Sequence, residues 1–108
     1  MEMATMNDYD SDVVKIKQAR RSILDNLNRI YDTPIQVRFL LRILLAVDST
    51  YTMSLLQKDL AYLKQKGYVE YTDDAIGGFA EYHKKFVGLT ANGKEIADRT
   101  AFDDALEI

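Results

Sequence analysis

Apolar residues recur with helical spacing in three stretches before residue 67 and alternate with polar residues in two shorter stretches after it. In the first stretch, residues 12–31, they follow one another at intervals of three, four and seven, which is the spacing of one helix face. They are Val13, Ile16, Ile23, Leu27 and Ile30, with Leu24 and Tyr31 beside them. The other faces carry lysines and arginines, so the pattern predicts an amphipathic helix capped by Ser11 or Asp12.

The second stretch, residues 34–47, is apolar on almost every side, and only Gln36, Arg38 and Arg42 are clearly polar. Thr33 followed by Pro34 is typical of an N-cap and the first position of a helix. A helix that is apolar all round usually lies inside the core, so we expect this one to be central. It is too short to span a bilayer.

The third stretch continues into a strand, in the sequence "LQKDLAYLKQKGYVEY" of residues 56–71. It predicts a helix over residues 53–66 that buries Met53, Leu56, Leu60 and Leu63. Thr52 is a suitable N-cap, and Gly67 occupies the position where a left-handed residue commonly ends a helix. "YVEYT" then alternates as a half-buried strand does, with Val69 and Tyr71 on one face.

A second strand is predicted over residues 81–90, "EYHKKFVGLT", and the turn "DDAIGG" at residues 73–78 joins the two strands into a hairpin. Thr90 is a suitable cap for a short last helix over residues 91–100. The tail adds an apolar contact through Phe102, Leu106 or Ile108. We therefore expect an acidic, disordered N-terminus at 1–10, one domain at 11–100 and an acidic tail at 101–108.

Charge is unevenly distributed along the 108 residues, although the net charge is only -3. Residues 1–12 carry four carboxylates and no lysine or arginine, and residues 95–108 carry five carboxylates and one arginine. The body between them has 13 basic and 8 acidic residues. Such a body is compatible with a nucleic-acid partner in spite of the negative net charge. The alternative, equally consistent with charge alone, is that the charged ends only aid solubility.

The order of three helices, a hairpin and a short helix is that of a winged helix-turn-helix, which is mainly α with a small β-hairpin (α+β). Three motifs carry the resemblance: "RRSILDNL" resembles the first helix of that family, "LQKDLAYLKQKGYVEY" the recognition helix running into the wing, and "GLTANGKEIAD" the L-T-x-x-G that follows. Over residues 12–100 the chain resembles ArsR- and MarR-type proteins and small prophage-encoded winged-helix proteins.

The resemblance implies a DNA-binding transcriptional regulator of a bacterium or prophage, cytoplasmic and dimeric, with its third helix in the major groove. The residues that would then face DNA are Thr52, Ser54, Gln57, Lys58, Ala61, Tyr62 and Gln65 on that helix, with Lys64 and Lys66 nearer phosphates and His83, Lys84 and Lys85 on the wing. Gln57 can pair with adenine, and Lys58 can donate to guanine or phosphate. The alternative is a solvated helix face and a wing strand kept soluble by its lysines.

A second function class is open, because winged helices also serve as protein-docking modules. The overall acidity and the absence of arginine from the third helix favour it. Arg38 and Arg42 can likewise contact phosphates, or pair within the chain with Asp25, Asp32 or Asp48, and we favour pairing.

The sequence contains no motif that indicates catalysis or metal binding. The chain has no cysteine and one histidine, so disulfides, thiolate sites and multi-histidine metal sites are excluded. It also lacks G-x-S-x-G and a phosphate-binding glycine loop. We expect no enzyme activity, no cofactor, no bound metal, no signal peptide and no membrane partner.

Overall fold

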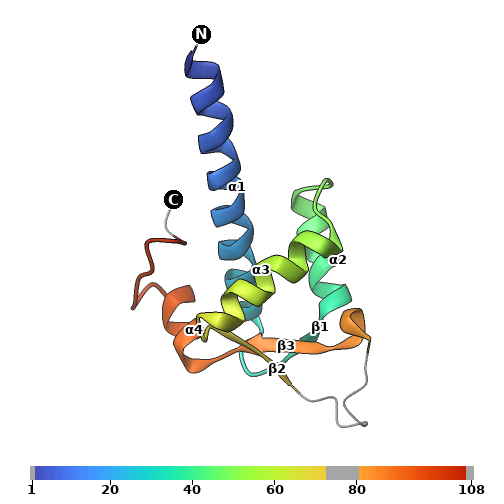
Figure 1. The fold of residues 1–108 in the computed structure, drawn as a ribbon. Helices are drawn as coiled ribbons and strands as arrows, with labels where there is room; N and C mark the ends of the chain where they lie inside the picture. Colours follow the sequence, from blue (N-terminus) through green and yellow to red (C-terminus); the bar gives the residue numbers. More distant parts are fainter. Residues whose placement is uncertain (1, 73–80, 107–108) are drawn as a thin grey trace.

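The computed structural model describes the backbone of residues 2–72 and 81–106, and within those ranges the side chains from residue 12 onward. The chain runs through α1 (Glu2–Arg29), β1 (Ile35–Gln36), α2 (Val37–Val47), α3 (Met53–Gln65), β2 (Val69–Thr72), the 3-10 turn η1 (Tyr82–Lys84), β3 (Phe86–Leu89) and α4 (Ala91–Ala97) (Figure 1). The described residues are mainly helical with a small antiparallel sheet, which confirms the α+β class.

The sheet has three strands in the order β1-β3-β2. β2 and β3 form the expected antiparallel pair, with Val69 opposite Leu89 and Tyr71 opposite Val87. The turn predicted at residues 73–78 lies outside the described residues. The sequence did not predict β1, which pairs Ile35 with Val87 on the other side of β3.

The added strand changes the start of the second helix. Gln36 is the N-cap of α2, with extended backbone (ψ 143°) and no side-chain capping bond, so the Thr33 cap and the helix start at Pro34 were wrong. The amide of Val37 donates to the carbonyl of Lys85 at 2.9 Å. Pairing with the backbone of β3 holds residues 35–36 extended. Because that pairing is with a distant segment, the local sequence pattern could not predict it.

The predicted strand over residues 81–90 is also shorter than expected. Tyr82–Lys84 form a 3-10 turn, closed by bonds from the Lys84 amide to the Glu81 carbonyl (2.9 Å) and from the Lys85 amide to the Tyr82 carbonyl (3.1 Å). The strand proper begins at Phe86. The prediction of a strand at His83 and Lys84, which was made from alternating side chains, was therefore wrong.

Helix α1 is longer than predicted, because it begins at Glu2 and is continuous to Arg29. Residues 2–10, where disorder was expected, are helical in this structure. Most residues of this segment are acceptable in a helix, and a helix already nucleated on the core extends one residue at a time without a new nucleation cost. Acidic side chains near a helix N-terminus also interact favourably with its dipole.

The core lies where α1, α2 and α3 meet above one face of the sheet. Its fully buried side chains are Ile23, Leu24, Leu27, Val37, Leu40, Leu56, Leu60, Leu63, Val69, Val87 and Leu106. Helix α2 contributes only one side to this core. Phe39, Ile43 and Val47 on its other side are exposed, so the prediction of a fully central helix was wrong for half of its surface.

Gly67 ends α3 as predicted, in the left-handed conformation (φ +83°). The Thr90 hydroxyl donates to the Gly67 carbonyl at 2.5 Å and accepts from the Gly93 amide at 3.0 Å, while the Thr90 amide donates to the Tyr68 carbonyl at 3.1 Å. Thr90 therefore caps α4 and ties its start to the end of α3. This gives the threonine and glycine of "GLTANG" a shared structural role.

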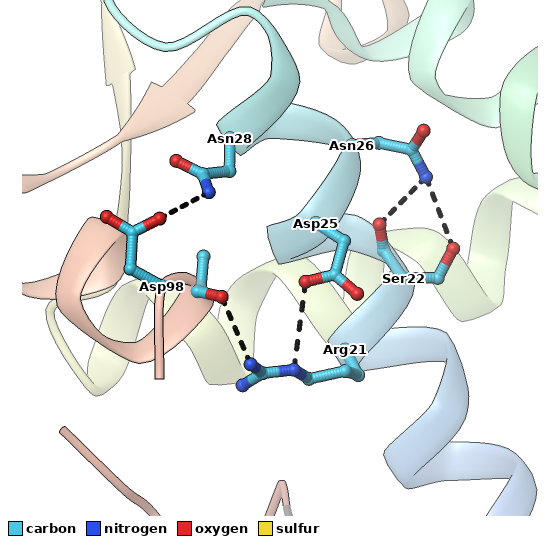
Figure 2. A network of polar contacts seen from close by, with 7 residues as sticks. Arg21, Ser22, Asp25, Asn26, Asn28 and Asp98 are labelled. Carbon is cyan, nitrogen blue, oxygen red and sulfur yellow. Dashed lines mark hydrogen bonds and ion pairs between the residues drawn. The ribbon is translucent and has the colours of Figure 1, made fainter. Parts of the chain in front are cut away.

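Polar contacts join α1 to the end of α4 (Figure 2). The buried Arg21 guanidinium donates to the Ala97 carbonyl at 3.2 Å, and its Nε lies 3.7 Å from Asp25 Oδ1. About two turns farther along α1, Asn28 Nδ2 donates to Asp98 Oδ1 at 2.8 Å. These contacts hold the C-terminal half of α1 against α4, so this half of α1 belongs to the body of the domain.

The tail is docked by one acidic and one apolar residue. Tyr68 donates its hydroxyl proton to Asp103 Oδ2 at 2.6 Å, and Lys66 Nζ lies 3.4 Å from the same oxygen. Leu106 is buried, whereas Phe102 is exposed, and Ile108 lies outside the described residues. The apolar contact expected from the tail is therefore made through Leu106.

Candidate nucleic-acid interface

Helix α3 presents one continuous polar face to solvent. Leu56, Leu60 and Leu63 turn inward at intervals of four and three, and Thr52 caps the helix by accepting from the Leu55 amide at 3.1 Å. The opposite side is exposed at seven of the positions expected to face DNA: Thr52, Ser54, Gln57, Lys58, Ala61, Lys64 and Gln65. The helix spacing thus brings these predicted residues together on one surface.

Part of this face lines a groove of about 400 Å³. One wall is α3, through Gln57, Ala61, Lys64 and Gln65, and the other is Tyr71 of β2 with Tyr82 of η1. The helix face and the base of the hairpin therefore border the same space.

The two tyrosines form a connected pair. Their hydroxyl oxygens lie 2.5 Å apart, and their rings meet edge to face with centroids 5.8 Å apart. Burial raises the pKa of Tyr71 and that of Tyr82, so both keep their hydroxyl protons at neutral pH. Lys85 Nζ lies 5.7 Å from the Tyr71 ring centroid. The sequence analysis placed neither tyrosine among the candidate contact residues, although both flank the hairpin turn.

The predicted wing residues lie in and after η1 and not along a strand edge. Lys84 is exposed, whereas His83 and Lys85 are half-buried. His83 Nε2 lies 3.4 Å from Glu81 Oε2. Gln36 bridges this turn to α2, because it donates to the Lys84 carbonyl at 3.1 Å and accepts from Arg38 Nε at 2.9 Å. A second basic group therefore stands at the base of the hairpin.

Tyr62 differs from the other predicted contacts on α3, because it is half-buried and packs against the core. The Arg20 guanidinium of α1 lies over its ring, 3.8 Å from the centroid. A cation stacked at this distance already occupies that face of the ring. Packing between α1 and α3 accounts for Tyr62, and its ring is not free to stack on a ligand from that side.

A buried ionic contact sets how α3 lies against α1. Asp59 points inward from α3, where Oδ1 accepts from Arg20 Nε at 3.1 Å and Oδ2 accepts from the Tyr51 hydroxyl at 2.5 Å. Burial, with the hydrogen bond to Asp59, raises the pKa of Tyr51, which therefore stays a donor. Directional bonds of this kind fix an orientation that leucine packing alone leaves adjustable.

Charge on the α3 face is partly unbalanced. Within the described part of the chain, no carboxylate forms an ion pair with Lys58, Lys64 or Lys84. Lys66, which we expected near phosphates, instead pairs with Asp103, so its charge is largely offset. The free lysines remain suited to an anionic partner.

Arg38 and Arg42 do not make the ion pairs that the sequence favoured. Among the described residues neither pairs with Asp25, Asp32 or Asp48. Asp25 instead lies beside Arg21, and Asp48 accepts from the Thr50 side chain and amide, which lower the pKa of Asp48. The aspartates are engaged by groups closer in sequence, so the expectation of pairing was wrong.

Metal-ligand clusters and membrane-spanning helices were both searched for among the described residues. No three histidine, cysteine, aspartate or glutamate side chains there are arranged to hold a metal ion. No helix among them is long and apolar enough to cross a membrane. Comparisons with known protein families, with characterised proteins and with solved structures found no match.

Proposed function

We propose that this chain is a winged-helix DNA-binding protein that acts as a transcriptional regulator in the cytoplasm of a bacterium or as part of a prophage. The observation that carries the proposal is the exposed face of α3, which borders one groove with the base of the β2–β3 hairpin. In this proposal α3 enters the major groove and the hairpin, as the wing, lies on the adjoining backbone. A major groove about 12 Å wide admits one helix.

Individual residues have distinct roles in this arrangement. Gln57 stands in the first half of α3, where an amide can accept from and donate to one adenine edge. Lys58 and Lys64 are exposed without a carboxylate partner in the described residues and donate to guanine or to phosphates. Lys84 at the hairpin base meets the backbone. The neutral side chains Ser54 and Ala61 allow the helix to approach the bases closely.

The first experiment is a titration of random duplex DNA at several salt concentrations. Contacts to phosphate release counterions, so the logarithm of the affinity should fall linearly as the logarithm of the salt concentration rises. The screening length is about 30 Å at 0.01 M salt, so any basic surface that binds DNA should do so there. Absence of binding at low salt would reject the proposal in favour of a protein-docking module.

The second experiment locates the surface. The double variant Gln57→Ala with Lys58→Ala should bind a selected duplex more weakly, with each lost base contact costing about 1–3 kcal/mol. The matched control is Arg29→Ala with Asn92→Ala, which removes the same charge and one amide from exposed positions on α1 and α4. Equal loss in both variants would assign the effect to net charge and not to α3.

A further inference from the structure

One side of α2 is an apolar stripe with no partner in the described structure. Phe39, Ile43 and Val47 follow one another at intervals of four residues and are 41%, 38% and 81% exposed. Arg38 and Arg42 form the adjacent row, with guanidinium carbons 5.2 Å and 5.4 Å from the Phe39 ring centroid. We call these five residues the α2 stripe. Arginine beside an exposed aromatic ring is a common composition for the centre of a protein interface.

The α2 stripe carries positive charge that the described residues do not offset. Arg38 bonds to the neutral Gln36, and neither Arg38 nor Arg42 forms an ion pair with another described residue. An occupant of this surface therefore needs an apolar strip together with carboxylates.

Helix α1 carries carboxylates together with the exposed apolar side chain of Ile16, and it projects away from the body (Figure 1). The helix begins at Glu2, whereas the first buried side chain among its described residues is Arg21. The molecule measures 55 Å along its longest axis and 30 Å or less across, which reflects this projection. Residues 1–12 contain four carboxylates and no lysine or arginine, and Ile16 farther along is 46% exposed.

The projecting half of α1 cannot reach its own α2 stripe. The helix is continuous through residues 2–29, and folding back would require a sharp break in it. The two surfaces nevertheless approach each other at one point, because Val47 lines a small cavity of about 100 Å³ together with Lys15 and Ala19 of α1. A helix from another chain that binds along the α2 stripe would therefore end close to Lys15 and Ala19 of α1.

We propose that the α2 stripe is the docking site for the acidic N-terminal half of α1 from a second copy of this chain. The same chain carries both complementary features, a basic apolar stripe without a partner in the described structure and an acidic helix that projects from the body. If the N-terminal half of α1 from each copy binds the α2 stripe of the other, the two identical contacts form a closed dimer with two-fold symmetry. Arg38 and Arg42 of each copy face the carboxylates of the other.

Sedimentation equilibrium on the full chain tests this assembly. The wild type should be a dimer, and Arg38→Glu with Arg42→Glu should weaken association by about tenfold or more, since like charges then face each other at two symmetric places. Replacing Asp8, Asp10 and Asp12 with lysine should weaken it similarly. The two sets combined in one chain reverse both partners and should restore the dimer.

Controls separate this effect from unfolding and from DNA binding. Leu55→Ser removes an exposed leucine from α3, outside the stripe, and should leave the dimer unchanged. Circular dichroism should be the same for the α2 and α3 variants, because the side chains substituted there are exposed. The lysines on α1 remove a favourable interaction with the helix dipole, so the control for them is the combined variant, which carries the same lysines and should reassociate. A monomeric wild type, or combined variants that fail to reassociate, would overturn the docking proposal. Both outcomes are measured without DNA, so they are independent of the proposed function.

Discussion

Alanine at Gly93 provides a test in which two physical effects have opposite signs. Inside a helix alanine is normally favoured over glycine by about 1 kcal/mol. Gly93 lies in α4, but a Cβ built there would be 1.9 Å from the Tyr68 carbonyl oxygen and 2.8 Å from the Tyr68 carbonyl carbon. Ordinary contacts between heavy atoms are about 3.5 Å or longer. The obstacle is backbone, which has no other rotamer to adopt.

The expected size follows from what has to move. Relief of the contact requires α4 to shift away from the start of β2, where the Thr90 amide bonds to the same Tyr68 carbonyl. Overpacking of this kind typically costs about 1–3 kcal/mol. A backbone obstacle only 1.9 Å away puts Gly93 at the upper end of that range, and subtracting the propensity gain of about 1 kcal/mol leaves about 2 kcal/mol. We expect Gly93→Ala to lower the free energy of unfolding by about 2 kcal/mol, which for a domain of this size lowers Tm by roughly 10 °C.

The measurement is denaturant unfolding with thermal unfolding as a check. Gly88→Ala is the matched control, because the atoms nearest to a Cβ at Gly88 belong to Pro34 and lie 3.6 Å or more away, which is ordinary contact. Its free energy of unfolding should be equal to that of the wild type or slightly higher. If Gly93→Ala proves as stable as Gly88→Ala, the close approach of α4 to Tyr68 is not present in solution and the reasoning fails.

Three further substitutions test the joints around α3. Gly67→Val should destabilise the domain by about 1–2 kcal/mol in the same unfolding assay, because the left-handed backbone at this position is costly for a branched residue; an unchanged Tm would contradict this. Tyr51→Phe removes a hydrogen bond to the buried carboxylate of Asp59 and should cost about 1.5–3 kcal/mol, with no loss if that bond is absent in solution. Asp103→Asn should make the free energy of unfolding fall less steeply as the pH is lowered. The Tyr68 hydrogen bond lowers the pKa of Asp103 in the folded state. The stabilisation from Asp103 is therefore complete above its ordinary pKa of about 3.9 and is lost as the pH falls through the lower folded value. A variant that loses stability in acid as steeply as the wild type would show that Asp103 is not the group responsible.

The sequence predicted those features that depend on near neighbours. The positions of α3 and its cap at Thr52 followed from leucine spacing and local capping chemistry, and the left-handed Gly67 followed from the end of that pattern. The exposed face of α3 was predictable for the same reason, because burial of Leu56, Leu60 and Leu63 fixes which side chains point outward.

The sequence could not predict which contacts form between distant segments. β1 is a strand only because β3 lies beside it, and the groove requires Tyr71 and Tyr82 to be brought against α3 from farther along the chain. Asp59 appears in the sequence as one more polar residue of a helix, yet Arg20 and Tyr51 make it a buried acceptor. Hydrophobic periodicity indicates which face of a helix or strand is buried, but it does not indicate which other element packs against that face.

Helix α2 shows most clearly which features follow from the sequence and which depend on tertiary contacts. The sequence by itself determined that this segment is helical and apolar on nearly every side, because those properties reside in its own residues. Tertiary structure decided that Val37, Leu40 and Leu44 face the core while Phe39, Ile43 and Val47 face outward. Neighbouring elements cover only one side of a helix in a domain this small, and the fold alone determines which side that is.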